Sequence, residues 1–369
     1  MAPALSNNGA APPQNSADGC WMEQCTTRYL TPFGGVPKVA GRAWGYWTKG
    51  KLDILRLYLD AFTTASKKSP EIVYIDAFAG EPENYDRLTG DPLDGSAKIA
   101  LSIENPPFSR LRFFETESKA PRLQEALRQG YPDRDFKVLA GDSNQILPLE
   151  LDSLRRYNWA PTFAFLDPNG TETHWQTLEA LAQYKSNKPY KVELFLLFPA
   201  PMFMRMLPTS GKSVRTEDKE SIDRMFGTTD WFRIYEARLA GHISPSEARS
   251  HYLNLMRWRI VESLCYKWAH FIEVKNEQNS PIYYLIFATD HEAGDRIMRS
   301  LFAKAAALFP RMREEARTLR HEREMAERGQ YSMFDPDTDF LLSPPGPEES
   351  FYEYEPPLRP EDGYSFPGL

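Results

Sequence analysis

The stretch EIVYIDAFAG, Glu71–Gly80, decides the fold. Its centre, Ile72 to Ile75, holds only β-branched and aromatic residues, which is typical of a strand buried on both faces of a parallel sheet. The run ends at Asp76, after which a glycine turn and a helix expected from Gly95-Ser96 complete half of a mononucleotide-binding unit. Ligands of such units lie outside the carboxyl ends of the strands. Asp76 therefore either faces a cofactor there or caps the turn.

Composition sets the class of protein. The chain has 369 residues, of which 41% are hydrophobic and 13% aromatic, enough for a large α/β domain with insertions or for more than one domain. It contains no run of eighteen apolar residues and no signal-peptide pattern, so we expect a cytoplasmic protein that does not enter a membrane. Cys20, Cys25 and Cys265 are expected to be reduced thiols, and no metal site is expected.

The net charge of −7 is unevenly distributed. Residues 330–369 contain nine acidic side chains, one arginine and eight prolines, which predicts a disordered acidic tail that is either simply solvated or binds a partner. The rest of the chain is close to neutral. A near-neutral body neither requires nor excludes a nucleic-acid partner, because a local basic patch would suffice.

The order of the patterns predicts a Rossmann-like, doubly wound α/β fold with a mostly parallel sheet, a helical insert and a C-terminal antiparallel hairpin. The expected segments are a flexible N-terminus (1–43), a cofactor-binding core (44–200), a helical insert (201–268), a hairpin and helix that complete the core (269–310), a charged helix (311–329) and the disordered tail (330–369).

Acidic residues follow three further predicted strands. Glu115 ends LRFFE, Asp142 follows FKVLA, and Asp167-Pro168-Asn169 follows the strand 163–166. Because the carboxyl ends of parallel strands meet at one edge, these acids should share that edge with Asp76. Turn capping would explain any one of them. Together Asp76, Glu115 and Asp142 favour a ligand rich in donors, such as an adenosine with its ribose diol.

Two other groups of residues leave alternatives open. Asp167-Pro168-Asn169 either orients an acceptor amine or forms an ordinary turn. Lys49 and Lys51 lie near an aromatic cluster, at the start of a helix expected from Thr48. They either hold a base or phosphate of a target or form a solvated basic edge.

Eight short motifs then carry a resemblance to a family. In order they are WTKGKLDILRLYL, YIDAFAG, DGSAKIAL, FFE, GDSNQIL, FAFLDPNG, LLFP followed by Arg205, and YYLIFATDH, over Trp47 to Phe309. They resemble the three-Cys-motif partner protein family, which is similar to class I S-adenosylmethionine-dependent methyltransferases. The resemblance implies this fold, S-adenosylmethionine as cofactor, and a separate partner protein that carries the three cysteines.

The resemblance also implies roles for individual residues. Asp76 and Gly80 would lie by the methionine end of the cofactor, Glu115 by the ribose, Asp142 by the adenine, Asp167 near the methyl acceptor and Arg205 on the target side. We further expect Phe78 among the cofactor-binding residues, Pro168 and Asn169 beside Asp167 in the catalytic group, and Lys49 and Lys51 with Arg205 among the substrate-binding residues. The chain departs from the family at Glu81, where the family has proline in Gly-Pro-Gly, and at Asn169, where it has an aromatic residue.

The predicted function is methyl transfer from S-adenosylmethionine to a nucleophile, with nucleic acid as a candidate target. The alternative is a methyltransferase-like binding or partner subunit that has lost turnover, a reading favoured by Glu81 and Asn169. A nicotinamide dehydrogenase is disfavoured, because the G-x-G-x-x-G fingerprint is missing.

Overall fold

The computed structural model describes residues 42–82, 84–210 and 213–327. All of them belong to one unit of the chain, Val39–Leu369. The expected flexible N-terminus, apart from its last two residues, and the expected acidic tail lie outside the described residues.

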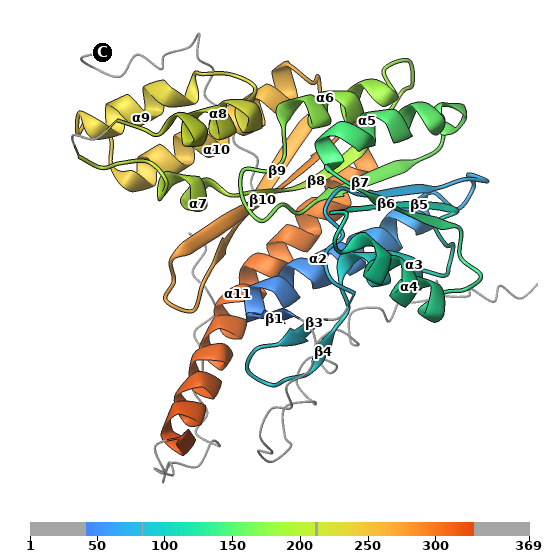
Figure 1. Ribbon diagram of the computed structural model, residues 1–369, viewed down its shortest axis with the longest axis horizontal. Coiled ribbons are helices and arrows are strands. Elements are labelled where there is room, and N and C mark those ends of the chain that lie inside the picture. Colours follow the sequence, from blue (N-terminus) through green and yellow to red (C-terminus); the bar gives the residue numbers. More distant parts are fainter. Residues whose placement is uncertain (1–41, 83, 211–212, 328–369) are drawn as a thin grey trace, which may run out of the picture. The chain divides into compact units, whose positions relative to one another are not determined.

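A seven-stranded sheet forms the centre of the fold (Figure 1). Across the sheet the strands are β6 (Phe136–Ala140), β5 (Arg110–Glu115), β2 (Val73–Asp76), β7 (Thr162–Leu166), β8 (Glu193–Phe198), β10 (Pro281–Thr289) and β9 (Trp268–Lys275). The first five are parallel, and β10 runs antiparallel to both β8 and β9. The chain order reverses between β2 and β7, so the predicted doubly wound, mostly parallel fold with a C-terminal hairpin is confirmed.

Strand β2 lies in the middle of this sheet and is buried along its whole length. Val73 and Ile75 belong to the hydrophobic core on one face, and Tyr74 belongs to the core on the other. Alternate side chains of β7 and β8 divide between the two cores in the same way. Burial on both faces explains why these strands have almost continuous apolar sequences.

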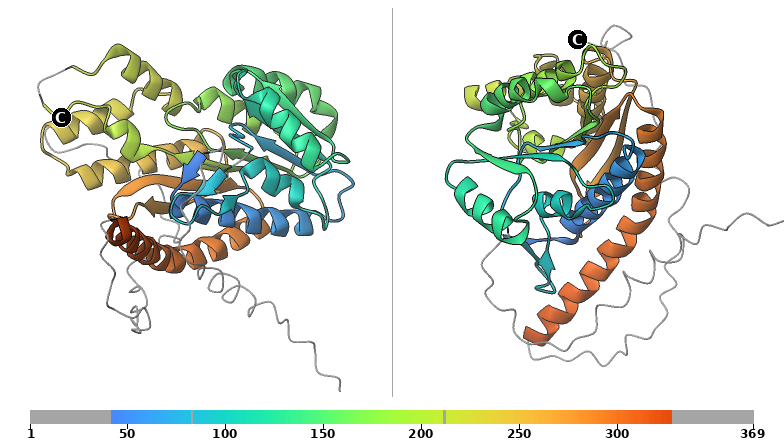
Figure 2. Two further views of the ribbon diagram at one scale, coloured as in Figure 1. Left: turned by 60° about the horizontal axis from the view of Figure 1, so that its bottom comes forward. Right: turned by 90° about the vertical axis from the view of Figure 1, so that its right-hand side faces the viewer.

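Helices cover both faces of the sheet, as the three views in Figures 1 and 2 show. One face is covered by α2 (Tyr46–Ala65), α3 (Ser96–Ser102), α4 (Ala120–Gly130) and α11 (Glu292–Glu327). The other is covered by α5 (Ser143–Ser153), α6 (Trp175–Tyr184) and the helical insert. The short 3-10 helix η1 (Arg155–Tyr157) precedes β7. Leu55 and Leu59 of α2 are fully buried against the sheet, as their helical spacing predicts.

The helical insert consists of α7 (Ala200–Met204), α8 (Thr216–Phe226), α9 (Trp231–Leu239) and α10 (Pro245–Glu262). The predicted capping box opens α10: the Ser244 hydroxyl accepts from the Glu247 amide, and the Glu247 carboxylate accepts from the Ser244 amide. Trp231 and Tyr252 are fully buried in the same core as α5 and α6. The insert is therefore packed onto the main domain through its aromatic side chains.

A second, three-stranded sheet is a feature that sequence analysis missed. It joins β1 (Arg42–Trp44), β3 (Asn84–Asp86) and β4 (Pro92–Leu93), in that order. The indole Nε1 of Trp44 donates to Asn84 Oδ1 at 2.8 Å, across 40 residues of sequence. The insert after Gly80 is thus a small hairpin held by the segment before α2, and β1 spans the expected boundary at residue 43.

No helix among the described residues combines the length and the apolar character that crossing a membrane requires.

Candidate functional site

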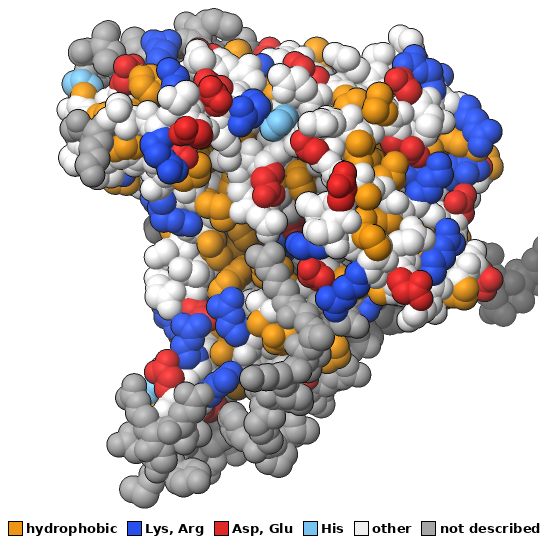
Figure 3. Space-filling model, viewed as in Figure 1, with side chains coloured by type: hydrophobic (Ala, Val, Ile, Leu, Met, Phe, Trp, Pro, Cys, Tyr) orange, Lys and Arg blue, Asp and Glu red, His pale blue; other side chains and the backbone are white. Residues whose placement is uncertain are grey.

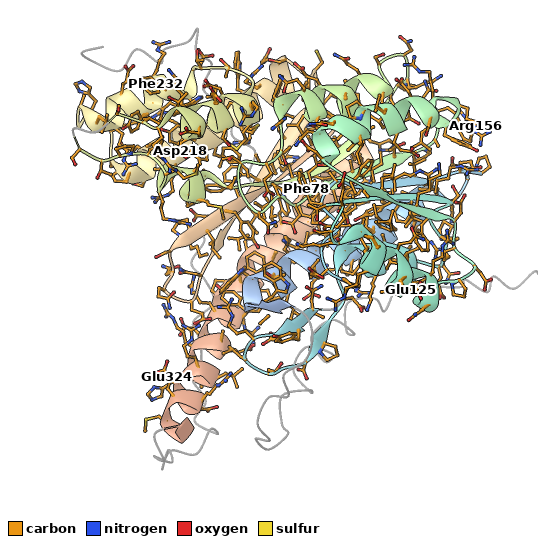
Figure 4. The ribbon with its side chains drawn as sticks, in the orientation of Figure 1. Phe78, Glu125, Arg156, Asp218, Phe232 and Glu324 are labelled. Carbon is orange, nitrogen blue, oxygen red and sulfur yellow. The ribbon has the colours of Figure 1, made fainter. Side chains whose placement is uncertain are left out.

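The candidate site lies at the carboxyl ends of β5, β2 and β7, where the strand order reverses. Asp76 ends β2 opposite Phe113 of β5 and Phe165 of β7, and Glu115 and Asp167 follow within two residues of these partners. Phe78, labelled in Figure 4, is half-buried beside the central strands. Asp142 follows β6, the parallel neighbour of β5, so all four predicted acids lie at the carboxyl ends of neighbouring strands.

Asp76 is a fully buried carboxyl group. It accepts the Phe78 amide at 3.3 Å and the Tyr74 hydroxyl at 3.3 Å. Burial raises the pKa of Asp76 to about 7, and the negative charge of Asp167 raises it further, although Ser96, Phe78 and Tyr74 donate hydrogen bonds that oppose the shift. A buried acid that is half protonated near neutral pH is able to interact with a cation or to hold a proton.

Asp167 forms an ion pair with Lys51, whose side chain reaches the edge from α2. The Lys51 side chain is 6% exposed and that of Asp167 22% exposed, so water screens the pair only weakly. The Lys51 ammonium also lies 5.7 Å from the centre of the Tyr283 ring. Lys51, predicted for the target side, is thus a buried counterion of the predicted acceptor-orienting residue.

The Glu115 carboxylate joins the end of β5 to the turn that follows β2. Its Oε2 accepts the Gly80 amide at 2.8 Å, and its Oε1 accepts both the amide and the hydroxyl of Thr116 at 2.8 and 3.0 Å. A carboxylate has about four acceptor positions. The hydrogen bonds of the described residues occupy three of them, so a further donor has room on Oε2.

Glu81 follows the turn glycine but its charge is directed away from the turn. Its carboxylate lies 3.7 Å from Lys119 and 3.6 Å from Arg122, both near the start of α4. Gly80 has φ +75°, and a Cβ built there would meet no atom within 4 Å. The turn therefore leaves open space beside Gly80, despite the departure from Gly-Pro-Gly.

Asp142 caps a turn, which is one of the two roles that the sequence left open for it. It is the N-cap of α5, where Oδ1 accepts the Asn144 amide at 2.9 Å, and its side chain is exposed. Asn144 in turn bonds the backbone of Glu172 and His174 in the loop after β7. The loops after β6 and β7 are therefore fastened together next to the site.

The other predicted residues are spread around this edge. Pro168 is buried, while Asn169 is exposed and its amide donates to Glu172 at 2.9 Å. Arg205 is exposed at the end of α7. Burial raises the pKa of Asp53 and of Glu315, and the positive charge of Lys49 opposes the rise at both.

The loop after β7 also contacts the helical insert. The Thr171 and Ser221 hydroxyl groups lie 2.5 Å apart and join this loop to α8. The contact brings α8 of the helical insert next to the loop that follows Asp167.

Sequence analysis missed three residues that shape the site: Tyr74, Thr116 and Tyr283. The position of Tyr74 could have been predicted from the sequence. Residues two apart in a strand share a face of the sheet, so the Tyr74 side chain must lie on the same face as Asp76. The position of Tyr283 could not have been predicted, because its nearness to Lys51 depends on how α2 crosses the distant strand β10.

The surface of the described residues mixes both charges. Seen as in Figure 3, Lys and Arg side chains alternate with Asp and Glu side chains over this face, which agrees with the near-neutral body predicted from composition. No three His, Cys, Asp or Glu side chains of the described residues lie close enough together to hold a metal ion.

Comparison with known proteins finds similarity in solved structures only. No protein-family model matches the chain, and no curated protein matches it. The crystal structure of the methyltransferase domain of bacterial CtHen1-C aligns at 10% identity and a TM-score of 0.31, over 64% of this chain and 98% of that chain. That of bacterial CtHen1-CN aligns at 11% identity and a TM-score of 0.30, over 64% and 99%.

The fold itself defines the class of protein. A doubly wound sheet whose strand order reverses between β2 and β7, and which ends in an antiparallel hairpin, is a Rossmann-like α/β fold.

Proposed function

We propose that this protein binds S-adenosylmethionine at the carboxyl ends of β5, β2 and β7 and transfers its methyl group to a nucleophile. The observation that carries the proposal is the group of carboxylates at this edge: buried Asp76, the Asp167–Lys51 ion pair, and Glu115 fixed by the Gly80 amide. In doubly wound sheets this is the place where ligands bind.

The residues present fit the proposed cofactor. Gly80 faces open space, so an extended ligand can approach the backbone where a side chain would otherwise project. Glu115 has an acceptor position for a ribose hydroxyl, and Asp76 offers negative charge to the amino end. When bound, the cofactor would supply an electrophilic methyl group. The protein would act mainly by positioning the acceptor, with Asp167 accepting a hydrogen bond from it.

The target is proposed to be nucleic acid, and a three-Cys-motif protein is proposed as partner. Both proposals rest on the resemblance of the motifs between Trp47 and Phe309. The contact between Thr171 and Ser221 supports a target side built from the loop after β7 and α8.

Calorimetric titration with S-adenosylmethionine and S-adenosylhomocysteine tests the cofactor. We expect binding by the wild type, and affinity that falls about 10-fold to 100-fold in Glu115→Gln, as for loss of a hydrogen bond to a charged group. Glu125→Gln is the matched control, because Glu125 is an exposed glutamate on α4, away from Phe78 in Figure 4. Absence of binding by the wild type, or equal affinity in Glu115→Gln, would contradict the proposal.

A binding subunit without turnover is the second candidate. The observation in its favour is that Lys51 already neutralises Asp167, the residue that would orient the acceptor. Transfer of a labelled methyl group to total RNA or DNA, with and without the partner protein, separates the two functions. Cofactor binding without any transfer supports the subunit. Because Glu81 is turned toward Lys119 and Arg122, Glu81→Gly should not change cofactor affinity; a rise would favour a degenerate cofactor site.

A further inference from the structure

A lysine ammonium is buried at the edge of the sheet beside two carboxyl groups. Lys51 comes from α2, Asp167 follows β7 and Asp76 ends β2. The Tyr74 hydroxyl donates to Asp76, and the Tyr283 ring lies beside the Lys51 ammonium. Lys51 is 5% exposed as a residue. Burying a charge is costly unless a partner compensates it, so Lys51 and Asp167 depend on each other here.

Fastening α2 to the sheet does not require this charge. Two turns along the same helix, the Tyr58 hydroxyl donates to Glu193 at 2.6 Å at the start of β8. Leu55 and Leu59 lie along the same helix and are fully buried. The helix is therefore held by packing and by a bond from an uncharged tyrosine, and what Lys51 adds is a positive charge at the ligand-facing edge.

That charge changes what the edge can attract. Two carboxylates side by side favour any cation that approaches, and they disfavour each other's ionisation. Lys51 compensates the negative charge of Asp167. Of the two neighbouring carboxyl groups, Asp76 is then the one that the Lys51 ion pair does not compensate. The ammonium thus occupies the position that a cationic ligand would otherwise take beside Asp167.

We infer that Lys51 is the resident counterion of this edge and determines how strongly the site prefers a cationic methyl donor over its neutral product. The inference rests on the proposed function. S-adenosylmethionine carries a sulfonium that S-adenosylhomocysteine lacks, so the ratio of their dissociation constants reports the charge of the edge. Lys51 acts through Asp167 and is a positioning residue rather than a catalytic one.

The ratio is measured by calorimetry at about pH 8, where ordinary carboxyl groups are ionised. Lys51→Met should raise the preference for S-adenosylmethionine over S-adenosylhomocysteine about tenfold, equal to about 1.4 kcal/mol. Asp167→Asn, which leaves the ammonium without its partner, should lower the preference by a similar factor. Lys51→Arg should keep the wild-type ratio, and the double variant Lys51→Met/Asp167→Asn should return toward it.

The outcomes separate the two proposals. If the wild type binds neither ligand, the proposed function fails. If the wild type binds both and the two single variants change both dissociation constants by one common factor, Lys51 has only a structural role and this inference is overturned, while the proposed function stands. Should Lys51→Met not fold, the opposite shift in Asp167→Asn and the retained ratio in Lys51→Arg decide the question.

Discussion

The backbone amide of Gly80 donates to Oε2 of Glu115 at 2.8 Å and joins the turn after β2 to the end of β5. Strands β2 and β5 are neighbours in the sheet, so this hydrogen bond holds the Glu115 carboxylate against the turn after β2. The carboxylate is consequently oriented before any ligand arrives, which reduces the entropy lost when one binds.

Gly80 offers a test that separates backbone strain from loss of a binding surface. Gly80 has φ +75° and Gly241 has φ +76°, and a Cβ at either position meets no atom within 4 Å. An alanine in this left-handed region costs roughly 1–2 kcal/mol, so Gly80→Ala and Gly241→Ala should lower the free energy of unfolding about equally. Only Gly80→Ala should weaken S-adenosylmethionine binding, by about tenfold or more.

Urea unfolding measures the first effect and calorimetry the second. Because Gly241 lies in the helical insert, between α9 and α10, it shares the backbone strain but not the ligand edge. Equal cofactor affinities in the two variants would show that no ligand approaches the turn.

Asp142 allows its capping role to be separated from its predicted contact with adenine. Its Oδ1 accepts the Asn144 amide and caps α5, and asparagine caps helices about as well as aspartate. Asp142→Asn should therefore keep the stability of the fold, whereas Asp142→Ala should lose about 1 kcal/mol in urea unfolding. If the Asp142 carboxylate also contacts the adenine, Asp142→Asn will weaken cofactor binding without a loss of stability. Unchanged cofactor affinity would show that Asp142 acts only as a helix cap.

Asp76 and Glu193 should each take away stability as the pH rises from about 4 to 7. Burial raises the pKa of Asp76 to about 7, and burial also raises the pKa of Glu193 to about 7. In this window the folded chain retains protons that the unfolded chain has released, and a state that binds more protons loses stability as protons become scarce. Asp76 faces Asp167, Tyr74 and Ser96, and Lys51 is paired with that neighbouring aspartate.

Replacing Asp76 by asparagine should remove its share of this loss. A shift of about three pKa units corresponds to about 4 kcal/mol, so Asp76→Asn should be more stable than the wild type above pH 7 by up to that amount. Glu193→Gln acts in the same pH range, and the double variant should gain the most stability relative to the wild type as the pH rises. Urea unfolding at about pH 5, 6, 7 and 8 measures the change; a stability difference between Asp76→Asn and the wild type that does not grow with pH would contradict the assignment.

The fold could be predicted because its central strands follow local rules. Strands β2, β7 and β8 are buried on both faces, so their apolar runs are unbroken and their ends are marked by acids or turn residues. The acids could then be placed on one edge, since parallel strands end together. The capping box of α10 is local in the same sense.

The contacts of the site could not be predicted, because they join distant parts of the chain. Lys51 and Asp167 are 116 residues apart, and their meeting depends on the angle at which α2 crosses the sheet. The small sheet was missed because β1, β3 and β4 have two or three residues each, too few for a pattern of alternation. Asp142 caps α5 through a local bond, and the sequence left this role open beside its predicted contact with adenine.

The buried ion pair between Arg112 and Glu150 provides the last prediction. Arg112 Nε donates to Glu150 Oε1 at 2.5 Å between β5 and α5, and the two residues are 4% and 9% exposed. Arg112→Met would leave the Glu150 carboxylate buried with only the exposed Lys137 at 3.7 Å, so the free energy of unfolding should fall by about 3–5 kcal/mol. The double variant Arg112→Met/Glu150→Met should lose less, because no charge is then left uncompensated.

The matched control is the exposed pair Arg155–Asp152, whose atoms lie 2.6 Å apart with side chains 77% and 64% exposed. Water screens this pair, so Arg155→Met should lower the free energy of unfolding far less than Arg112→Met does. Urea unfolding of the four proteins compares the two environments directly. If Arg112→Met costs no more than Arg155→Met, then water or another cation reaches Glu150, and β5 and α5 are held together by their apolar contacts alone.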